Sequence, residues 1–132
     1  MSKLSRKKDN REHLIRNLVT SLILYESIKT TKAKSKKLKS EFDKLVIKAK
    51  KNDLMARRHV NGYLFDKNAY KKMFDVIVPR YKTRNSGFTR VLSFSNRLGD
   101  NSEINLVELV DKIDSKDSVP DSPETVKDQN AK

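Results

Sequence analysis

Apolar side chains recur at helical spacing along much of the chain, and the first such stripe is the longest. Its members are Leu14, Ile15, Leu18, Val19, Leu22 and Ile23. Residues three and four apart share one face of a helix, so this stripe predicts a helix over residues 10–25. Asp9 and Glu12 have the spacing of a capping box, which places the start of this helix at Asp9.

A second helix is expected over residues 32–51, after Thr31, which is placed to cap its first turn. The apolar face of this helix is narrow and consists of Leu38, Phe42, Leu45, Val46 and Ala49. Lysines fill nine of the other positions, so the remaining surface is strongly basic. A lysine-rich face either binds phosphates or is only solvated, and the sequence leaves both interpretations open.

Two shorter helices are expected next. Asp53 is placed to cap a helix over residues 54–64, and a further apolar stripe predicts a helix over residues 67–77. Proline lacks a backbone N–H and disfavours a helical conformation in the residue before it. Pro79 is therefore expected to end the fourth helix or to follow closely after its end.

Three strands are predicted by segments that are rich in β-branched residues or that alternate apolar with polar positions. They cover residues 27–31, 88–94 and 104–110. Turn-forming residues without an apolar period occupy 80–87 and 99–102, so both segments are expected to be loops. The order α-β-α-α-α-β-β favours an α+β fold, with the helices packed on one face of a small mixed three-stranded sheet.

The chain divides into three parts by composition. Residues 1–9 form a basic N-terminal arm, and residues 10–111 form a single α+β domain of ordinary size. Residues 112–132 are acidic, contain two prolines and offer almost nothing to bury. We expect these last residues to be a disordered acidic tail.

The charge of the chain indicates what the domain binds. The 132 residues include 30 Lys and Arg against 17 Asp and Glu, a net charge of +13. Such an excess favours a polyanionic partner, with nucleic acid as the first expectation and an anionic membrane surface as the second. The longest apolar run is three residues, so no membrane span is expected. No apolar segment follows the basic start either, so no secretory signal is expected.

No residue pattern typical of catalysis occurs in the sequence. Because it has no cysteine, no phosphate-binding glycine loop and no H-E-x-x-H motif, we expect no enzyme, metal site, cofactor or small-molecule substrate. His13 lies on or beside the first apolar stripe and is interpreted as a packed or capping-region residue rather than a base. His59 either contacts a phosphate or is solvated. The scattered carboxylates have basic neighbours, as in ion pairs on helix surfaces.

Three basic groups are candidates for binding RNA: the arm, the lysine-rich second helix and the loop with its following strand at 80–90. Arginines interleaved with aromatic rings suit RNA, because guanidinium groups bind phosphates bidentately and rings stack on splayed bases. The alternative for Tyr81 and Phe88 is a place in the core at a strand edge. With Arg16, which lies off the first stripe and is expected to reach outward, the candidate residues are Lys3, Arg6, Lys7, Lys8, Arg11, Arg16, Lys34, Lys36, Lys37, Arg57, Arg58, Arg80, Tyr81, Lys82, Arg84, Asn85, Phe88, Thr89, Arg90 and Arg97.

Six blocks carry a family resemblance in order along residues 3–111. They read RNLVTSLILYE-x-IKTT-x-AK at 16–34, DLMARR at 53–58, PRY at 79–81, RN-x-GFTRVL at 84–92, R-x-GDN at 97–101 and VELVD at 107–111. With these blocks the chain closely resembles the bacterial large-subunit ribosomal protein family that is seventeenth in the L series.

The resemblance implies an α+β fold and a structural, non-catalytic role in the large (50S) ribosomal subunit of a bacterium. It implies binding to 23S ribosomal RNA near the peptide exit tunnel, beside neighbouring large-subunit proteins, in the cytoplasm. Family members usually begin with a longer segment that ends in a Ser-Ser-His-Arg-like stretch, whereas this chain has Lys8, Asp9, Asn10 and Arg11 in that place. Contacts of the missing residues are therefore not transferred, and Asp9, which would repel phosphate, is assigned to the helix cap.

Two other functions fit the sequence less well. A free-standing DNA- or RNA-binding regulator could use the second to fourth helices as a helix-turn-helix. The basic residues, however, are spread over arm, helices and loop rather than gathered on one recognition helix. A nucleic-acid-processing enzyme would need a clustered acidic pair to hold metal ions, and the sequence offers none.

Overall fold

The first apolar stripe forms helix α1 (Lys8–Tyr25) in a computed structural model that describes residues 3–111. Its buried apolar side consists of Ile15, Val19, Leu22 and Ile23. The predicted capping box is wrong, because the helix begins one residue before Asp9 and its N-cap residue, Lys7, makes no side-chain hydrogen bond. Asp9 instead lies in the first turn, where its carboxylate faces the positive end of the helix dipole.

A single residue, Glu26, connects α1 to strand β1 (Ser27–Thr31). Its φ of 59° is in the left-handed region, and its N–H donates to the carbonyl of Leu22. Helix α2 (Lys32–Lys50) follows β1 without a loop. Thr31 is the N-cap residue of α2, as expected, although its side chain makes no capping hydrogen bond.

Aspartates start the next two helices. The carboxylate of Asp53 accepts a hydrogen bond from the N–H of Leu54 at 2.7 Å, and this confirms Asp53 as the cap of α3 (Leu54–Tyr63). Asp66 accepts from the N–H of Asn68 at the start of α4 (Lys67–Lys72). Both caps satisfy amide groups that a helix leaves without internal partners.

The fourth helix extends beyond its predicted end at residue 77 and includes Pro79 in its last turn. Helix α4 continues through a π-helical turn, η1 (Met73–Ile77), into a short last turn, α5 (Val78–Arg80), which contains the proline. The π turn changes the hydrogen-bond register just before Pro79, and the α pattern resumes when the N–H of Tyr81 donates to the carbonyl of Ile77. The hydrogen-bond register changes where the proline offers no backbone N–H. The helix can therefore continue past Pro79 and end at Arg80.

The sheet contains β1, β2 (Thr89–Asn96) and β3 (Glu103–Leu109) in the spatial order β1-β3-β2. Both pairs are antiparallel, so the predicted mixed sheet is wrong. The short turn between β2 and β3 forces these two strands to run in opposite directions. β1 and β2 run in the same direction but are never neighbours, because β3 lies between them.

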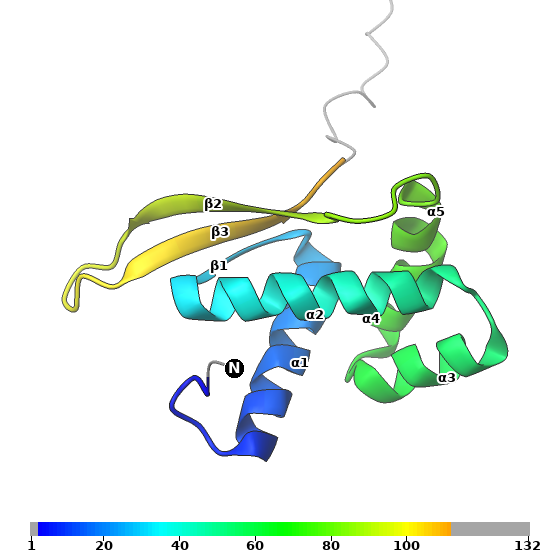
Figure 1. Ribbon diagram of the computed structural model, residues 1–132, viewed down its shortest axis with the longest axis horizontal. Helices are drawn as coiled ribbons and strands as arrows, with labels where there is room; N and C mark the ends of the chain where they lie inside the picture. The colour runs from blue at the N-terminus through cyan, green and yellow to red at the C-terminus, as the bar shows by residue number, and fades with distance from the viewer. Residues whose placement is uncertain (1–2, 112–132) are drawn as a thin grey trace, which may run out of the picture.

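The helices lie on one face of this sheet, as predicted, and α1 and α2 cross beneath it (Figure 1). The core between the two layers includes Phe42 of α2 and Val107 of β3, both without solvent exposure. Lys8 and Asp9 belong to α1 rather than to the arm, and Leu4 of the arm packs against the core. The predicted disorder of 112–132 lies outside the described residues. Within them, no helix is both long and apolar enough to span a membrane.

Candidate RNA interface

Basic side chains without carboxylate partners gather at the start of α1. Lys3, Arg6, Lys7 and Lys8 are exposed, and within residues 3–111 none of them forms an ion pair with a carboxylate. The guanidinium of Arg6 donates to the carbonyl of Leu4, which holds the arm in a turn. The positive end of the α1 dipole lies among these cations, so a polyanion here would relieve their mutual repulsion and satisfy the free amides of the helix.

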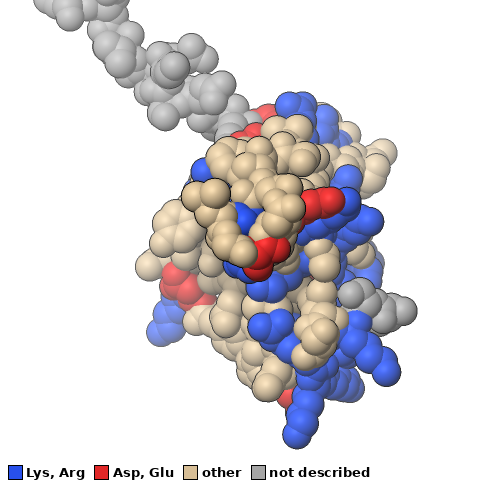
Figure 2. All heavy atoms as spheres, turned by 90° about the vertical axis from the view of Figure 1, so that its left-hand side faces the viewer, with Lys and Arg blue, Asp and Glu red and all other residues tan. Residues whose placement is uncertain are grey.

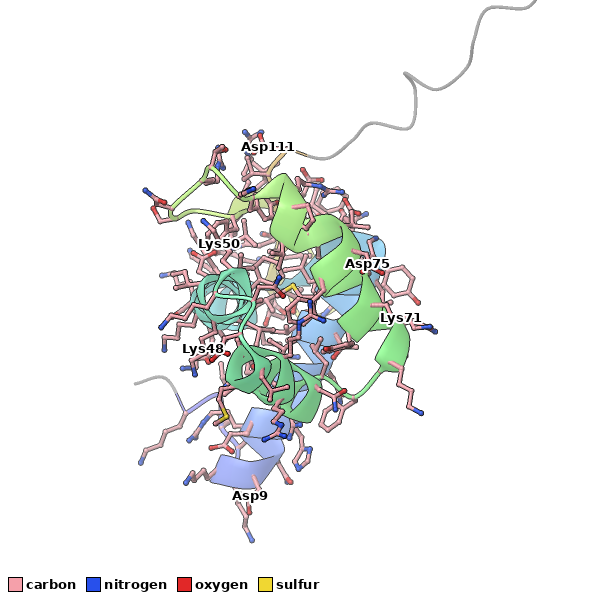
Figure 3. All side chains as sticks on the ribbon, turned by 90° about the vertical axis from the view of Figure 1, so that its right-hand side faces the viewer. Asp9, Lys48, Lys50, Lys71, Asp75 and Asp111 are labelled. Atoms are coloured by element: carbon pink, nitrogen blue, oxygen red, sulfur yellow. The ribbon has the colours of Figure 1, made fainter. Side chains whose placement is uncertain are left out.

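Helices α2 and α3 carry a second group of cations. Lys36 is exposed and Lys34 is half-buried on α2, and Arg57 and Arg58 are exposed on α3. Lys37 is different, because its ammonium pairs with the carboxylate of Glu41 at 2.9 Å. Exposed Lys39 and Lys51 were not among the predicted residues, although the lysine run of the sequence contains both. In a view along α2, Lys50 lies above the helix and Lys48 below it (Figure 3). Lys48 is exposed, whereas the half-buried Lys50 donates from its ammonium to the carbonyl of Arg84 at 2.6 Å.

A hollow of about 540 Å³ lies between α1, α2 and α3, and the carboxylates of Glu12 and Glu41 are part of its lining. Arg11 and Arg16 of α1, Lys37 of α2 and His59 of α3 contribute to its walls. The ring of His59 is exposed, stacks on Tyr63 and lies 2.9 Å from the ammonium of Lys48. His13, interpreted from sequence as a packed residue, is exposed with its ring stacked on Phe65.

Arg16 does not reach outward as predicted. Its guanidinium donates to the carbonyls of Gly62 and Tyr63, the last residues of α3, and lies 4.2 Å from the ring centroid of Phe65. These carbonyls are among those that a helix end leaves without internal partners. Arg16 therefore fastens α1 to the end of α3, and the contact links residues 46 and 47 positions apart.

Arg80 is also engaged within the fold. Its guanidinium forms two hydrogen bonds with the carboxylate of Glu26, Nη1–Oε2 at 2.8 Å and Nη2–Oε1 at 3.3 Å, and its side chain is only 9% exposed. Lys72 of α4 binds the same carboxylate at 2.9 Å. Arg80 and, more weakly, Lys72 lower the pKa of Glu26 to about 2 against the opposing effect of burial.

The two aromatic rings of the loop lie in the core. Tyr81 and Phe88 have no solvent exposure, and Thr89 is also buried. The Tyr81 hydroxyl donates to the carbonyl of Val110 and lies 3.2 Å from that of Phe88. Burial raises the pKa of Tyr81 to about 12. Neither ring offers a face for base stacking, so the alternative left open by the sequence, a core position at a strand edge, describes both.

The remaining predicted residues lie along the loop and the sheet. Lys82, Asn85 and Arg90 are exposed. Arg84 is half-buried and donates to the carbonyl of Gly87 at 3.0 Å. Arg97 is exposed at the β2–β3 turn and pairs with Asp100, and this guanidinium holds the pKa of the aspartate well below its usual range. The loop thus offers fewer free cations than its sequence suggests.

Within residues 3–111, no group of three or more His, Asp or Glu side chains is arranged to hold a metal ion. The geometry instead presents cations from the arm, α2, α3 and the loop on one rigid domain. Such a surface suits a polyanion that is recognised by its shape.

Comparison with known proteins agrees with this geometry. A model of the family described as ribosomal protein L17 matches residues 14–110. The chain is 49% identical to the large ribosomal subunit protein bL17 of Endomicrobium trichonymphae over 109 residues, 83% of this chain and 93% of the relative. It is 43% identical to the bL17 protein of Caldanaerobacter subterraneus over 108 residues, 82% of this chain and 96% of the relative. The chain therefore belongs to the ribosomal protein L17 family, whose members are structural, non-enzymatic components of the ribosome.

Proposed function

We propose that this protein binds 23S ribosomal RNA near the peptide exit tunnel and stabilises the local RNA fold beside neighbouring proteins of the large subunit. A structural ribosomal role comes with the family. The observation that supports RNA binding is the cluster of exposed cations without carboxylate partners at the positive end of α1, continued over α2 and α3.

The proposed contact set differs from the one expected from sequence. Buried Tyr81, Phe88 and Thr89 are left out, and so are Arg16 and Arg80, whose guanidinium groups are bound within the fold. Lys37, Arg84 and Arg97 are already paired with carboxylates within the fold, so they contribute less. The residues we retain as principal RNA contacts are Lys3, Arg6, Lys7, Lys8, Arg11, Lys34, Lys36, Arg57, Arg58, Lys82, Asn85 and Arg90.

Mechanistically, the domain acts as a clamp between RNA segments. Cations on several elements neutralise phosphates and release their counterions, and this release supplies most of the affinity. The spacing of the cations on the folded domain selects the shape of the RNA rather than a base sequence. The compartment is the cytoplasm of a bacterium, where its ribosomes assemble.

Binding to 23S ribosomal RNA over a salt series tests the electrostatic mechanism. With on the order of ten phosphate contacts, affinity falls steeply between low and moderate salt. Stoichiometric sedimentation with the large subunit after a high-salt wash tests the ribosomal role. A flat salt response would contradict the RNA-binding mechanism, and loss of the chain from the subunit fraction would contradict the role in the particle.

A tethered probe tests the location. The chain contains no cysteine, so a cysteine introduced at Arg58 is the only attachment point for an iron–EDTA group. Cleavage of 23S ribosomal RNA by hydroxyl radicals is expected in the segments that line the tunnel exit. The same probe at Tyr25, which is 73% exposed and outside the contact set, is the matched control. Cleavage from position 58 elsewhere in the subunit would contradict the proposed location.

A further inference from the structure

The hairpin of β2 and β3 extends beyond the helical layer and ends in a turn that has no other element beneath it (Figure 1). Three large apolar side chains of this hairpin are exposed. Leu92 is 42% exposed, Phe94 is 52% exposed, and Leu98 at the turn is 99% exposed. Exposed apolar side chains are unremarkable singly, but three on one projecting element form a candidate binding surface.

Hydrogen bonds within the turn fix the position of Leu98. The N–H of Arg97 donates to the carbonyl of Ser102, and the N–H of Asn101 donates to the carbonyl of Arg97, each at 3.0 Å. The carboxylate of Asp100 accepts from the N–H of Ser102 and binds the guanidinium of Arg97. Gly99, with a φ of 107°, supplies the left-handed conformation that the turn requires. Leu98 is therefore presented by a preorganised turn.

The charge of the hairpin differs from that of the rest of the domain. Residues 91–104 contain one arginine and two carboxylates, in a chain with a net charge of +13. Arg97 is paired with Asp100, and Glu103 is paired with Lys32 of α2 at 2.6 Å. In Figure 2 the end of the hairpin faces the viewer and is mainly tan with small red areas, whereas blue side chains surround it. Phosphate groups gain little from this surface.

One aromatic ring of the hairpin, on the edge strand β2, is contacted by a side chain from the opposite edge of the sheet. The ammonium of Lys29 on β1 lies 3.8 Å from the ring centroid of Phe94. On β3, Leu106 is the register partner of both Lys29 and Leu92 and is half-buried. This arrangement restricts Phe94 before any partner binds, which lowers the entropic cost of an interface there.

We propose that the β2–β3 hairpin is a protein-docking element, in which Leu92, Phe94 and Leu98 bind an apolar, uncharged cleft of a neighbouring large-subunit protein. The basic surfaces at the arm, α2, α3 and residues 82–90 remain for RNA. The inference rests on the proposed function in one respect: it takes the neighbouring protein to be a component of the same large ribosomal subunit. In a protein–protein interface, a few apolar and aromatic side chains at its centre usually supply most of the binding energy.

Site-specific photo-cross-linking tests this inference. The full chain with a benzoylphenylalanine at position 98 is incorporated into large subunits, which are then purified, irradiated and digested. A cross-link to one defined ribosomal protein is expected, and the same substitution at Leu54, which is 59% exposed on α3, is the matched control. A cross-link from position 98 to ribosomal RNA, or no protein cross-link above that of the control, would overturn the proposal.

Substitution separates docking from RNA binding. The variant Phe94→Ser with Leu98→Ser removes only exposed apolar groups, so its fold is retained. We expect its affinity for 23S ribosomal RNA to stay within about twofold of wild type, while its retention in salt-washed subunits falls at least about fivefold. The control Leu54→Ser with Met55→Ser keeps normal retention. An equal loss of RNA affinity and retention would overturn the docking assignment, whereas failure of the wild-type chain to bind RNA would contradict the proposed function instead.

Discussion

The guanidinium of Arg80 and the carboxylate of Glu26 form a bidentate ion pair between residues 54 positions apart in the chain. Glu26 is the single left-handed residue between α1 and β1, and its backbone carbonyl also accepts the N–H of Leu109 at 2.9 Å. One residue thus connects the first helix, the fourth helical segment and the central strand. This makes Glu26 a structural residue whose charge state governs stability.

The variant Glu26→Gln should lose a pH-dependent part of the free energy of unfolding. The pKa of Glu26 in the fold, about 2, lies below its ordinary value of 4.5. The charged pair therefore stabilises the fold fully above about pH 4.5, by about 2–3 kcal/mol, and this stabilisation is lost as the pH falls towards 2. Urea unfolding between pH 7 and 2 should show the two proteins converging at low pH. Glu12→Gln, at an exposed position, is the control, and a difference independent of pH would contradict the assignment.

Arg80→Ala and Arg58→Ala should impair different properties: the first should lower the stability of the fold, and the second should lower the affinity for RNA. Loss of Arg80 leaves a largely buried carboxylate with Lys72 alone, so the free energy of unfolding should fall by about 2–3 kcal/mol. Arg58 is exposed, and its loss should change stability by less than about 0.5 kcal/mol while RNA affinity falls several-fold. Urea unfolding and filter binding on the same samples measure both effects. Equal stability of the two variants would show that the ion pair contributes nothing.

Tyr81→Phe should destabilise the domain without weakening RNA binding of the folded protein. The hydroxyl satisfies backbone carbonyls at the ends of β2 and β3, and its removal should cost about 1–2 kcal/mol. Burial raises the pKa of Tyr81 to about 12. In a pH titration of tyrosinate absorbance, the variant should therefore differ from the wild type only at the high-pH end, where Tyr81 ionises. A loss of RNA affinity per folded molecule would instead return Tyr81 to the RNA-binding set.

Replacing Arg6, Lys7 and Lys8 with glutamine should weaken RNA binding and leave the free protein at least as stable. If each contacts one phosphate, the slope of log affinity against log salt should decrease in magnitude by about 2–3. Cations near the positive end of α1 disfavour the helix, so their removal should not lower the melting temperature. An unchanged salt slope would show that the arm does not contact phosphate.

Patterns that are local in sequence predicted the elements well. The apolar stripes predicted the helices because each stripe reflects a buried helix face. Alternation predicted the strands, although most residues of β2 are exposed on both faces. The predictions failed where an outcome depends on hydrogen-bond register rather than on burial. The π turn before Pro79 allows the helix to continue past a residue that usually ends one, and no spacing of apolar residues signals that turn.

The binding residues were harder to predict than the fold, for a related reason. Composition shows that arginines are abundant but not which of them are already bound. Arg16 and Arg80 have carbonyl and carboxylate partners between 46 and 54 positions away, and these contacts exist only once the helices have packed. For Tyr81 and Phe88, the sequence offered two interpretations, and burial distinguishes them.

The position of β3 in the sheet has a consequence for the order of folding. β3 is the last of the three strands in sequence but the central one in space, so β1 and β2 have no strand partner until residues 103–109 have been synthesised. The helices from α1 to α5 contact one another, and all of them precede β2 and β3 in the chain, so they can begin to pack first. A nascent chain would thus complete its basic helical surface before the hairpin exists, and RNA binding could precede the docking of any protein neighbour.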